Sequence, residues 1–360
     1  MTALIDVVNL RVSFVTRAEP LRVVRGVDLR LARGEALGIV GETGSGKTVA
    51  TSAFTGLLPP AARVEADALA FDGRSLLRDG MLDTRAVEAL RGRGIGMIFQ
   101  DPSSAMNPVF TIGEVMVDVL RRHEGLRFDV ARTRALELLG RVGLPEPGAV
   151  FGGYPHRLSG GMKQRAAIAT VLATRPSLLI ADEPTTALDA TVQAQVLALL
   201  AELRRDSGES LIFISHDLAV VSRVCDRVAV MYAGRIVEEG AVEQLYRAPA
   251  HPYTRGLFAA RPMLRRPSRL DEVQAVVRGR ERLPLMAIPG AVPPLSQLPQ
   301  GCAFHPRCLL ATARCAAEVP PLAPLHLAGE KATEVGDDAP GGAIVTRVAC
   351  FHPMRPDGES

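Results

Sequence analysis

Hydrophobic and polar positions along the first 240 residues form two kinds of pattern, one typical of strands and one typical of helices. Residues 4–40 are rich in β-branched residues and leucine, and turns at Arg25-Gly26 and Arg33-Gly34 divide them, which predicts strands. Residues 131–144 (ARTRALELLGRVGL) carry hydrophobic residues at helical spacing. Residues 176–214 then predict strand, helix and strand in succession. Such alternation indicates a parallel sheet and an α/β fold.

Shorter segments add detail to this pattern. Residues 35–40 (EALGIV) predict a buried strand, residues 90–100 (LRGRGIGMIFQ) a strand that ends in a glutamine, and residues 101–109 (DPSSAMNPV) a loop. After about residue 246 the chain becomes proline-rich and loop-like, as in residues 283–301 (LPLMAIPGAVPPLSQLPQG). We therefore expect two domains, at residues 1–245 and 246–360.

The composition and the hydrophobic runs favour a globular protein over a nucleic-acid-binding or membrane-spanning one. The 360 residues are 47% hydrophobic and 22% charged, and the formal net charge of +3 is too small to suggest a nucleic-acid partner. No hydrophobic run reaches about 18 residues, and the N-terminus lacks the layout of a secretory signal. We therefore expect no membrane-spanning helix and a location in the cytosol, where thiols stay reduced.

A glycine-rich segment between the predicted strand at 35–40 and a following helix carries the first candidate site. Its sequence, GETGSGKT, fits the phosphate-binding loop G-x-x-x-x-G-K-[ST]. The glycines let backbone N–H groups point at phosphate oxygens, Lys47 offers a positive charge to the β- and γ-phosphates, and Thr48 offers a hydroxyl to Mg²⁺. The residues expected to contact nucleotide here are Gly41, Glu42, Thr43, Gly44, Ser45, Gly46, Lys47 and Thr48.

Two further segments supply groups that a phosphate site needs. Residues 178–184 (LLIADEP) predict a buried strand ending in two carboxylates: Asp182 would hold Mg²⁺ through water, and Glu183 would polarise a water for attack on the γ-phosphate. Residues 158–165 (LSGGMKQR) place Ser159, Gly160 and Gly161 at the start of a helix, where a capping serine and free N–H groups make a second anion site.

Taken together, these segments resemble the ATP-binding subunits of ABC transporters. Six motifs stand in that family's order: GETGSGKT, Gln100, LSGGM, LLIADEP, TALD at 186–189, and ISHD with His216. The signature reads LSGGM where the general family has LSGGQ. The resemblance implies a P-loop ABC ATPase domain with a parallel-sheet core, an antiparallel β subdomain and a helical lobe at about residues 100–160.

In this family two ATPase domains face head to tail, and each ATP lies between the phosphate loop of one and the signature turn of the other. The resemblance therefore implies that a single chain does not complete an ATP and Mg²⁺ site. For Phe14, a lone phenylalanine in a predicted N-terminal strand, packing into the core is as typical as binding adenine. The catalytic roles implied are Glu183 as general base, His216 as contact of the γ-phosphate and Gln100 as ligand of Mg²⁺ and water. The other roles implied are Thr48 and Asp182 as further Mg²⁺ ligands, Asp189 as link between the two sites, and Phe14 as platform for adenine.

Three segments resemble the dipeptide/oligopeptide/nickel branch of these importers: residues 99–114 (FQDPSSAMNPVFTIGE), 154–165 (YPHRLSGGMKQR) and 251–257 (HPYTRGL). In that branch a groove at Met106, Pro108 and Phe110 would accept a helix of the permease, although the same residues suit the core of the lobe. The resemblance implies peripheral attachment to the cytoplasmic face of the inner membrane. Its implied partners are two permease subunits, a second ABC ATPase chain (the same or different) and an extracytoplasmic substrate-binding protein.

The function expected is ATP hydrolysis that powers peptide import. Import of nickel or another non-peptide solute is the first alternative, and a soluble ABC ATPase of DNA repair or translation the second. A second set of motifs or a coiled-coil insertion would favour the soluble ATPase, and the chain has neither. A non-catalytic partner would lack Lys47, Glu183 or His216, and all three are present.

Four cysteines gather near the C-terminus, at Cys302, Cys308, Cys315 and Cys350. Four thiolates are the ligand set of a [4Fe–4S] cluster and also of tetrahedral zinc. The wide spacing, C-x₅-C-x₆-C and a distant Cys350, favours the cluster, as does the resemblance to peptide importers. A Cys₃His zinc site with His305 or His352, and inert thiols, remain open. The fifth cysteine, Cys225, is expected to be a buried residue within a helix.

Overall fold

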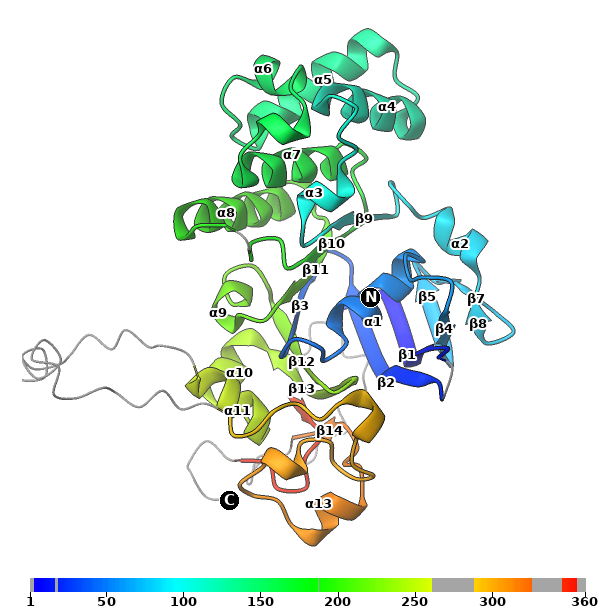
Figure 1. Cartoon of the computed structure of the whole chain (residues 1–360), viewed down its shortest axis with the longest axis vertical. Coiled ribbons are helices and arrows are strands. Elements are labelled where there is room, and N and C mark those ends of the chain that lie inside the picture. Colours follow the sequence, from blue (N-terminus) through cyan, green and yellow to red (C-terminus); the bar gives the residue numbers. More distant parts are fainter. Residues whose placement is uncertain (1–2, 17–18, 187, 261–287, 326–344, 355–360) are drawn as a thin grey trace, which may run out of the picture.

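The computed structural model describes residues 3–16, 19–186, 188–260, 288–325 and 345–354. Ala187 of the TALD motif, residues 283–287 of the proline-rich stretch and parts of the predicted C-terminal domain lie outside the described residues. Figure 1 shows the helical lobe at the top, a mixed sheet through the centre, a β subdomain at one side and the C-terminal segments below. Across the described ranges, no helix combines the length and hydrophobicity needed to cross a bilayer.

The central sheet is mixed, and its described strands follow the order β14-β15-β13-β12-β3-β11-β10-β9. Five neighbouring strands are parallel to one another, which confirms the predicted parallel core. These are β12 (Arg227–Tyr232), β3 (Ala36–Val40), β11 (Ser210–Ser215), β10 (Leu178–Asp182) and β9 (Ile95–Ile98). Every residue of β3, β10 and β11 is buried, as expected of a parallel sheet covered on both faces. Their carboxyl ends therefore meet at one edge, where open α/β sheets bind ligands.

A second sheet forms the antiparallel β subdomain. Its two long strands, β1 (Ala3–Phe14) and β2 (Leu21–Ala32), pair along most of their length. The short strands complete it: β4 (Ala62–Glu65), β5 (Ala68–Phe71), β6 (Arg74–Ser75), β7 (Leu77–Arg78) and β8 (Met81–Leu82). Its inward residues share one core cluster with Ala50, Ala53 and Phe54 of α1 (Lys47–Thr55) and with Ile212 and Ile214 of β11. The subdomain thus covers one face of the central sheet.

Helices cover the other face and build the lobe. Leu211 and Phe213 point to this second core, since successive strand residues face opposite sides. The lobe contains α4 (Ile112–Glu124), α5 (Phe128–Arg141), α6 (Pro147–Phe151), the 3₁₀ turn η1 (Pro155–Arg157) and α7 (Gly160–Leu172). A capping box of Thr111 and Glu114 starts α4. Further helices along the cassette include α2 (Thr84–Glu88), α8 (Ala190–Ser207) and α9 (Leu218–Val221).

The C-terminal segments pack directly against the central sheet. The strand β15 (Arg347–Val348) pairs antiparallel with β13 (Arg235–Ala241), and β14 (Ala323–Pro324) pairs with β15. Phe304 is 3% exposed and belongs to the same core cluster as the lobe helices. The other elements are α10 (Val242–Arg247), α11 (Pro252–Ala259), η2 (Leu295–Gln297), η3 (His305–Arg307) and α13 (Ala313–Ala317). The division at residue 245 falls inside α10 and stays a prediction.

Three local predictions were wrong. Residues 101–109 are not entirely loop, because Asp101 caps a short helix, α3 (Pro102–Ala105), by accepting from Ser103 N. The strand predicted at 90–100 is limited to β9, because glycines at 92 and 94 form the turn before it. Cys225 is buried as expected but lies after the turn that follows α9, not inside a helix.

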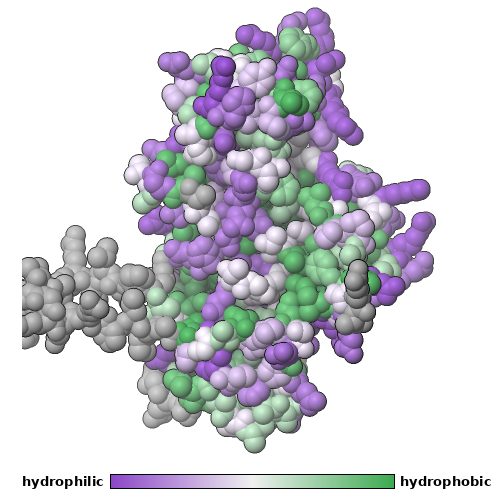
Figure 2. Space-filling view, in the orientation of Figure 1, coloured by the Kyte–Doolittle hydropathy of each residue, from purple (hydrophilic) through white to green (hydrophobic). Residues whose placement is uncertain are grey.

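On the face in Figure 2, hydrophilic residues cover much of the lobe and hydrophobic residues gather nearer the middle.

Candidate nucleotide site

The phosphate loop connects β3 to α1 and requires glycine for steric reasons. A Cβ on Gly41 would lie 2.1 Å from the carbonyl oxygen of Met231, far inside contact distance. Gly46 caps α1 with φ 100°, in the left-handed region that favours glycine. The loop therefore turns sharply, and the N-terminus of α1 is free of any side-chain cap. This is the geometry of an anion site at a helix N-terminus.

Lys47, the first residue of α1, lies under the loop. Its Nζ donates to the carbonyl oxygens of Gly41 (2.8 Å) and Glu42 (3.1 Å), and the residue is 5% exposed. Burial lowers the pKa of Lys47, while the carboxylates of Glu183, Asp182 and Glu42 act to raise it. A buried ammonium needs negatively charged partners, so this side chain suits the phosphates of a bound nucleotide.

Thr48 and Asp182 come together although they lie far apart in the sequence. Thr48 Oγ1 donates to Asp182 Oδ1 at 3.0 Å, although 134 positions separate them. Asp182 ends β10 and is 4% exposed, and burial raises the pKa of its carboxyl group. A hydroxyl and a carboxylate in contact are the pair that holds Mg²⁺ in P-loop proteins. The residues fit the cation that the sequence predicts here.

The Glu183 carboxylate receives three contacts at one oxygen atom. Thr186 Oγ1 donates to Glu183 Oε2 at 2.9 Å, His216 Nδ1 lies 3.3 Å from it, and Gln100 Nε2 donates at 3.4 Å. His216 follows β11, and Gln100 follows β9, so neighbouring strands bring them to one edge of the sheet. The structure thus groups the three residues to which the family resemblance assigns catalysis. Thr186 is a further member of the group that the motif reading did not single out.

The backbone at Glu183 is also constrained. Its φ is 43°, a value that few residues other than glycine adopt, and its N–H donates to the carbonyl oxygen of Ile214 at 3.0 Å. The neighbouring strand therefore holds the residue in a strained conformation, with its side chain 13% exposed. Strained backbone of this kind clusters at functional sites.

The signature turn and Asp189 each cap a helix. Ser159 Oγ accepts from Met162 N at 3.4 Å at the start of α7, and Ser159 and Gly160 are exposed. Asp189 Oδ1 accepts from Thr191 N and Val192 N, both at 3.0 Å, at the start of α8. Within the described residues no hydrogen bond joins Ser159, Gly160 or Gly161 to the phosphate loop. Ser159 and Gly160 are therefore accessible from outside the chain.

Phe14 lies at the end of β1, opposite Leu21 and Ala62 on the neighbouring strands. It is half-buried and packs against the core of the β subdomain. Both interpretations of Phe14 therefore stay open, since a half-buried ring can pack on one face and bind adenine on the other.

The phosphate loop has two further contacts that motif reading missed. Tyr253 Oη accepts from Glu42 N at 2.8 Å, and Arg307 donates to both oxygens of Glu42, at 2.7 and 3.1 Å. Tyr253 lies in the HPYTRGL segment, where His251 caps α11 by accepting from Tyr253 N. Local sequence offers no signal for the second, which spans 265 positions.

The four C-terminal cysteines line one small cavity, together with His305 and His352. Burial raises the pKa of the Cys302 and Cys308 thiols, and it raises that of Cys350 to about 12. Among the residues that the structure describes, no group of three or more Cys, His, Asp or Glu side chains is arranged to hold a metal ion. The predicted metal site is thus gathered in one place but is not formed as a ligand set.

The fold and the site define a P-loop nucleotide-binding protein whose predicted catalytic residues meet at the edge of a parallel sheet. Comparison with known proteins agrees. Residues 24–186 match the family described as ABC transporter, and residues 237–284 and 270–315 match the oligopeptide/dipeptide transporter C-terminal region.

Three known proteins illustrate the similarity. The chain is 44% identical over 314 residues to the dipeptide transport ATP-binding protein DppD of Haemophilus influenzae, covering 87% of this chain and 90% of that protein. It is 45% identical over 305 residues to the oligopeptide transport ATP-binding protein OppD of Bacillus subtilis, covering 84% and 81%. A dimeric ATP-binding cassette in a post-hydrolysis state with ADP and Pi matches with a TM-score of 0.57 at 26% identity, covering 66% and 98%. The chain belongs to the ATP-binding proteins of the ABC transporter family.

Proposed function

We propose that this chain hydrolyses ATP to power the import of peptides through a membrane ABC transporter. The observation that carries the proposal is the convergence of Lys47, Thr48, Asp182, Glu183 and His216 at one edge of the sheet. The names of the relatives, dipeptide and oligopeptide transport ATP-binding proteins, support peptide over nickel as the solute.

Each group at the sheet edge has a chemical task in this proposal. The N–H groups of Gly41–Thr48 and the Lys47 ammonium bind the phosphates of ATP. Thr48, Asp182 and Gln100 would hold Mg²⁺, which would supply positive charge to the phosphate oxygens. Glu183 accepts a proton from the attacking water, and the contacts from Thr186, His216 and Gln100 orient its carboxylate. His216, whose side chain is 53% exposed, is free to reach the γ-phosphate.

A second ATPase chain, the same or different, completes the site. The Ser159–Gly161 turn, whose first two residues are exposed, supplies N–H groups at the start of α7, a helix of 13 residues, to the γ-phosphate bound by the partner. Asp189 and Phe14 take the roles of inter-site link and adenine platform.

The membrane partners are two permease subunits, supplied with substrate by an extracytoplasmic binding protein, so the chain lies at the cytoplasmic face of the inner membrane. The segment between α3 and α4 supports contact with a permease helix. Pro108 is exposed, Val109 is 70% exposed and Phe110 is 47% exposed, whereas Met106 packs against the lobe. Exposed hydrophobic residues in one short segment suit a helix-binding surface better than a core.

Uptake in cells tests the proposed solute. A strain lacking the gene should lose uptake of di- and oligopeptides while nickel uptake stays normal, and the wild-type gene should restore it. The Lys47→Ala gene serves as the matched control and should not restore uptake. Loss of nickel uptake with normal peptide uptake would contradict the peptide assignment.

We also propose that Cys302, Cys308, Cys315 and Cys350 bind a [4Fe–4S] cluster. The shared cavity, the four thiols and the reducing compartment support the donor set. Bound iron would hold these thiols as thiolates, and the cluster would cross-link a proline-rich segment to residues near β13.

Metal analysis of protein purified without oxygen tests this. We expect about four irons and four sulfides per chain in wild type, and loss of both in Cys308→Ala. Cys225→Ala is the matched control, because Cys225 lies outside the cavity, and it should keep the iron. One zinc per chain, or no metal, would contradict the cluster.

A further inference from the structure

An arginine from the cysteine-bearing segment reaches the phosphate loop. Arg307 donates from Nη1 to Glu42 Oε2 at 2.7 Å and from Nη2 to Glu42 Oε1 at 3.1 Å. The Arg307 side chain is 4% exposed and that of Glu42 is 29% exposed. These two parallel, largely buried, charge-assisted hydrogen bonds fix the distance and the orientation of the Glu42 carboxylate relative to the Arg307 guanidinium. The second residue of the phosphate loop is therefore held from outside the loop.

The guanidinium would keep its place without Glu42. Arg307 Nε donates to the carbonyl oxygen of Pro289 at 2.8 Å, and further contacts of 3.4 Å reach Gly290 O and Tyr232 Oη. The rings of Tyr232 and Phe304 each lie 5.9 Å from Arg307 Cζ. These contacts hold the positive charge of Arg307 next to the phosphate loop in addition to its pair with Glu42.

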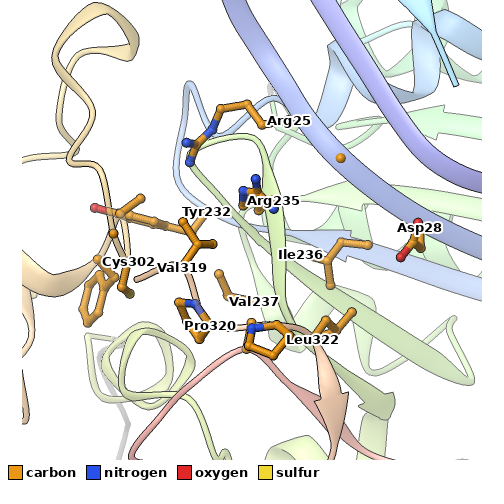
Figure 3. Close-up of a pocket in the computed structure, with 16 residues that line it drawn as sticks. Arg25, Asp28, Tyr232, Arg235, Ile236, Val237, Cys302, Val319, Pro320 and Leu322 are labelled. Atoms are coloured by element: carbon orange, nitrogen blue, oxygen red, sulfur yellow. The ribbon is translucent and has the colours of Figure 1, made fainter. Parts of the chain in front are cut away.

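The backbone of Glu42 is held as well. Its N–H donates to Tyr253 Oη. The centroid of the Tyr253 ring lies 4.6 Å from that of the Tyr232 ring and 5.4 Å from that of the Phe304 ring. Figure 3 shows Tyr232 and Cys302 on the same side of the pocket between the central sheet and the C-terminal segments. One aromatic cluster therefore supports both contacts to Glu42.

The Glu42 carboxylate matters for ATP because of its charge. It is one of the three carboxylates that act to raise the pKa of Lys47, so its field is felt where phosphates would bind. A carboxylate so placed repels a polyanionic ligand unless a cation neutralises it. Among the described residues, Arg307 is the cation that forms an ion pair with this carboxylate.

We propose that Arg307 is a positioning residue for ATP: it neutralises Glu42 and holds it aside, so that the cysteine-bearing segment sets the ATP affinity of the phosphate loop. This rests on the proposed ATP binding at that loop. Arg307 ends the turn η3, which lies between Cys302 and Cys308; His305 N donates to Cys302 O, and Cys308 N to His305 O. Rearrangement of this turn therefore moves the group that neutralises Glu42.

The loss of Arg307 and the loss of Glu42 are expected to change the Kd for ATP differently, because they leave unpaired charges of opposite sign. In Arg307→Met, the unpaired Glu42 carboxylate should raise the Kd and KM for ATP about tenfold, with a much smaller change in kcat. In Glu42→Gln, the remaining Arg307 charge should leave the Kd unchanged or lower it. The double variant Glu42→Gln/Arg307→Met should return to within about threefold of wild type, because no unpaired charge remains.

ATP titration of the full-length chain tests whether Arg307 sets the ATP affinity through Glu42. The unfolding temperature of each variant checks that it is folded. An unchanged Kd in Arg307→Met, or weaker binding in both single variants with no recovery in the double variant, would overturn the proposal. If Arg307→Met does not fold, Arg307→Lys replaces it and should raise the Kd less, since it keeps the charge but loses the paired contact. Failure of wild type itself to bind ATP would refute the proposed function instead.

Discussion

Replacing Glu183 by glutamine is expected to lower the rate of ATP hydrolysis by about 10²- to 10⁴-fold, the usual contribution of a general base. Glutamine has nearly the same shape and can keep the contacts from Thr186 and Gln100, so the loop and the Mg²⁺ site stay intact. What is lost is the negative charge of the carboxylate and, with it, the ability to accept a proton from water. ATP should therefore bind and remain, and the ATP-bound dimer should accumulate.

Two measurements check this result: phosphate release under saturating ATP, and molecular mass with and without ATP and Mg²⁺. The matched control is Glu243→Gln, because Glu243 is an exposed acid that pairs with Arg247 on α10, away from the sheet edge. The control should hydrolyse ATP at the wild-type rate and remain monomeric whenever wild type does. A Glu183→Gln chain with wild-type turnover would remove Glu183 from the role of base.

Replacing Lys47 by alanine has the second large expected effect, on binding and not on the chemical step. The ammonium is 5% exposed and lies beside Gly41 and Glu42 of the loop. Without it, the carboxylates of Asp182 and Glu183 face the phosphates with no opposing charge from this position. We expect ATP affinity to fall by about 100-fold, the effect of losing one or two charge-assisted hydrogen bonds.

Equilibrium binding of a fluorescent ATP analogue measures the loss. Arg247→Ala, which removes an exposed positive charge outside the site, is the control and should bind as wild type does. Wild-type affinity in Lys47→Ala would mean that the nucleotide lies elsewhere. Because Glu183→Gln retains ATP and Lys47→Ala excludes it, the pair also separates the binding step from hydrolysis.

Sequence patterns predict the elements around the site well, because buried parallel strands are continuous hydrophobic runs. The second strand predicted within residues 176–214 corresponds to β11 (Ser210–Ser215). The helix predicted at residues 131–144 corresponds to α5, which begins three residues earlier, at Phe128. The errors occur where one side chain overrides composition, as when Asp101 starts α3 in a segment that reads as loop.

The motifs likewise identify the groups at the sheet edge, since each follows the end of a strand in the parallel core. What they omit are contacts that depend on tertiary packing. Thr186 was not singled out, although it makes the shortest contact to Glu183. The link from Arg307 to Glu42 crosses most of the chain and appears only once Phe304 is packed into the core.

The most direct test of the account is coupled turnover. The chain, its proposed ATPase partner and the two permease subunits are placed in lipid vesicles, with the peptide-loaded binding protein outside and ATP at the opposite face. We predict that peptide enters, that ATP hydrolysis rises with it, and that both cease with Glu183→Gln. Hydrolysis that continues unchanged by peptide, with no uptake, would contradict the claim that this site powers peptide import.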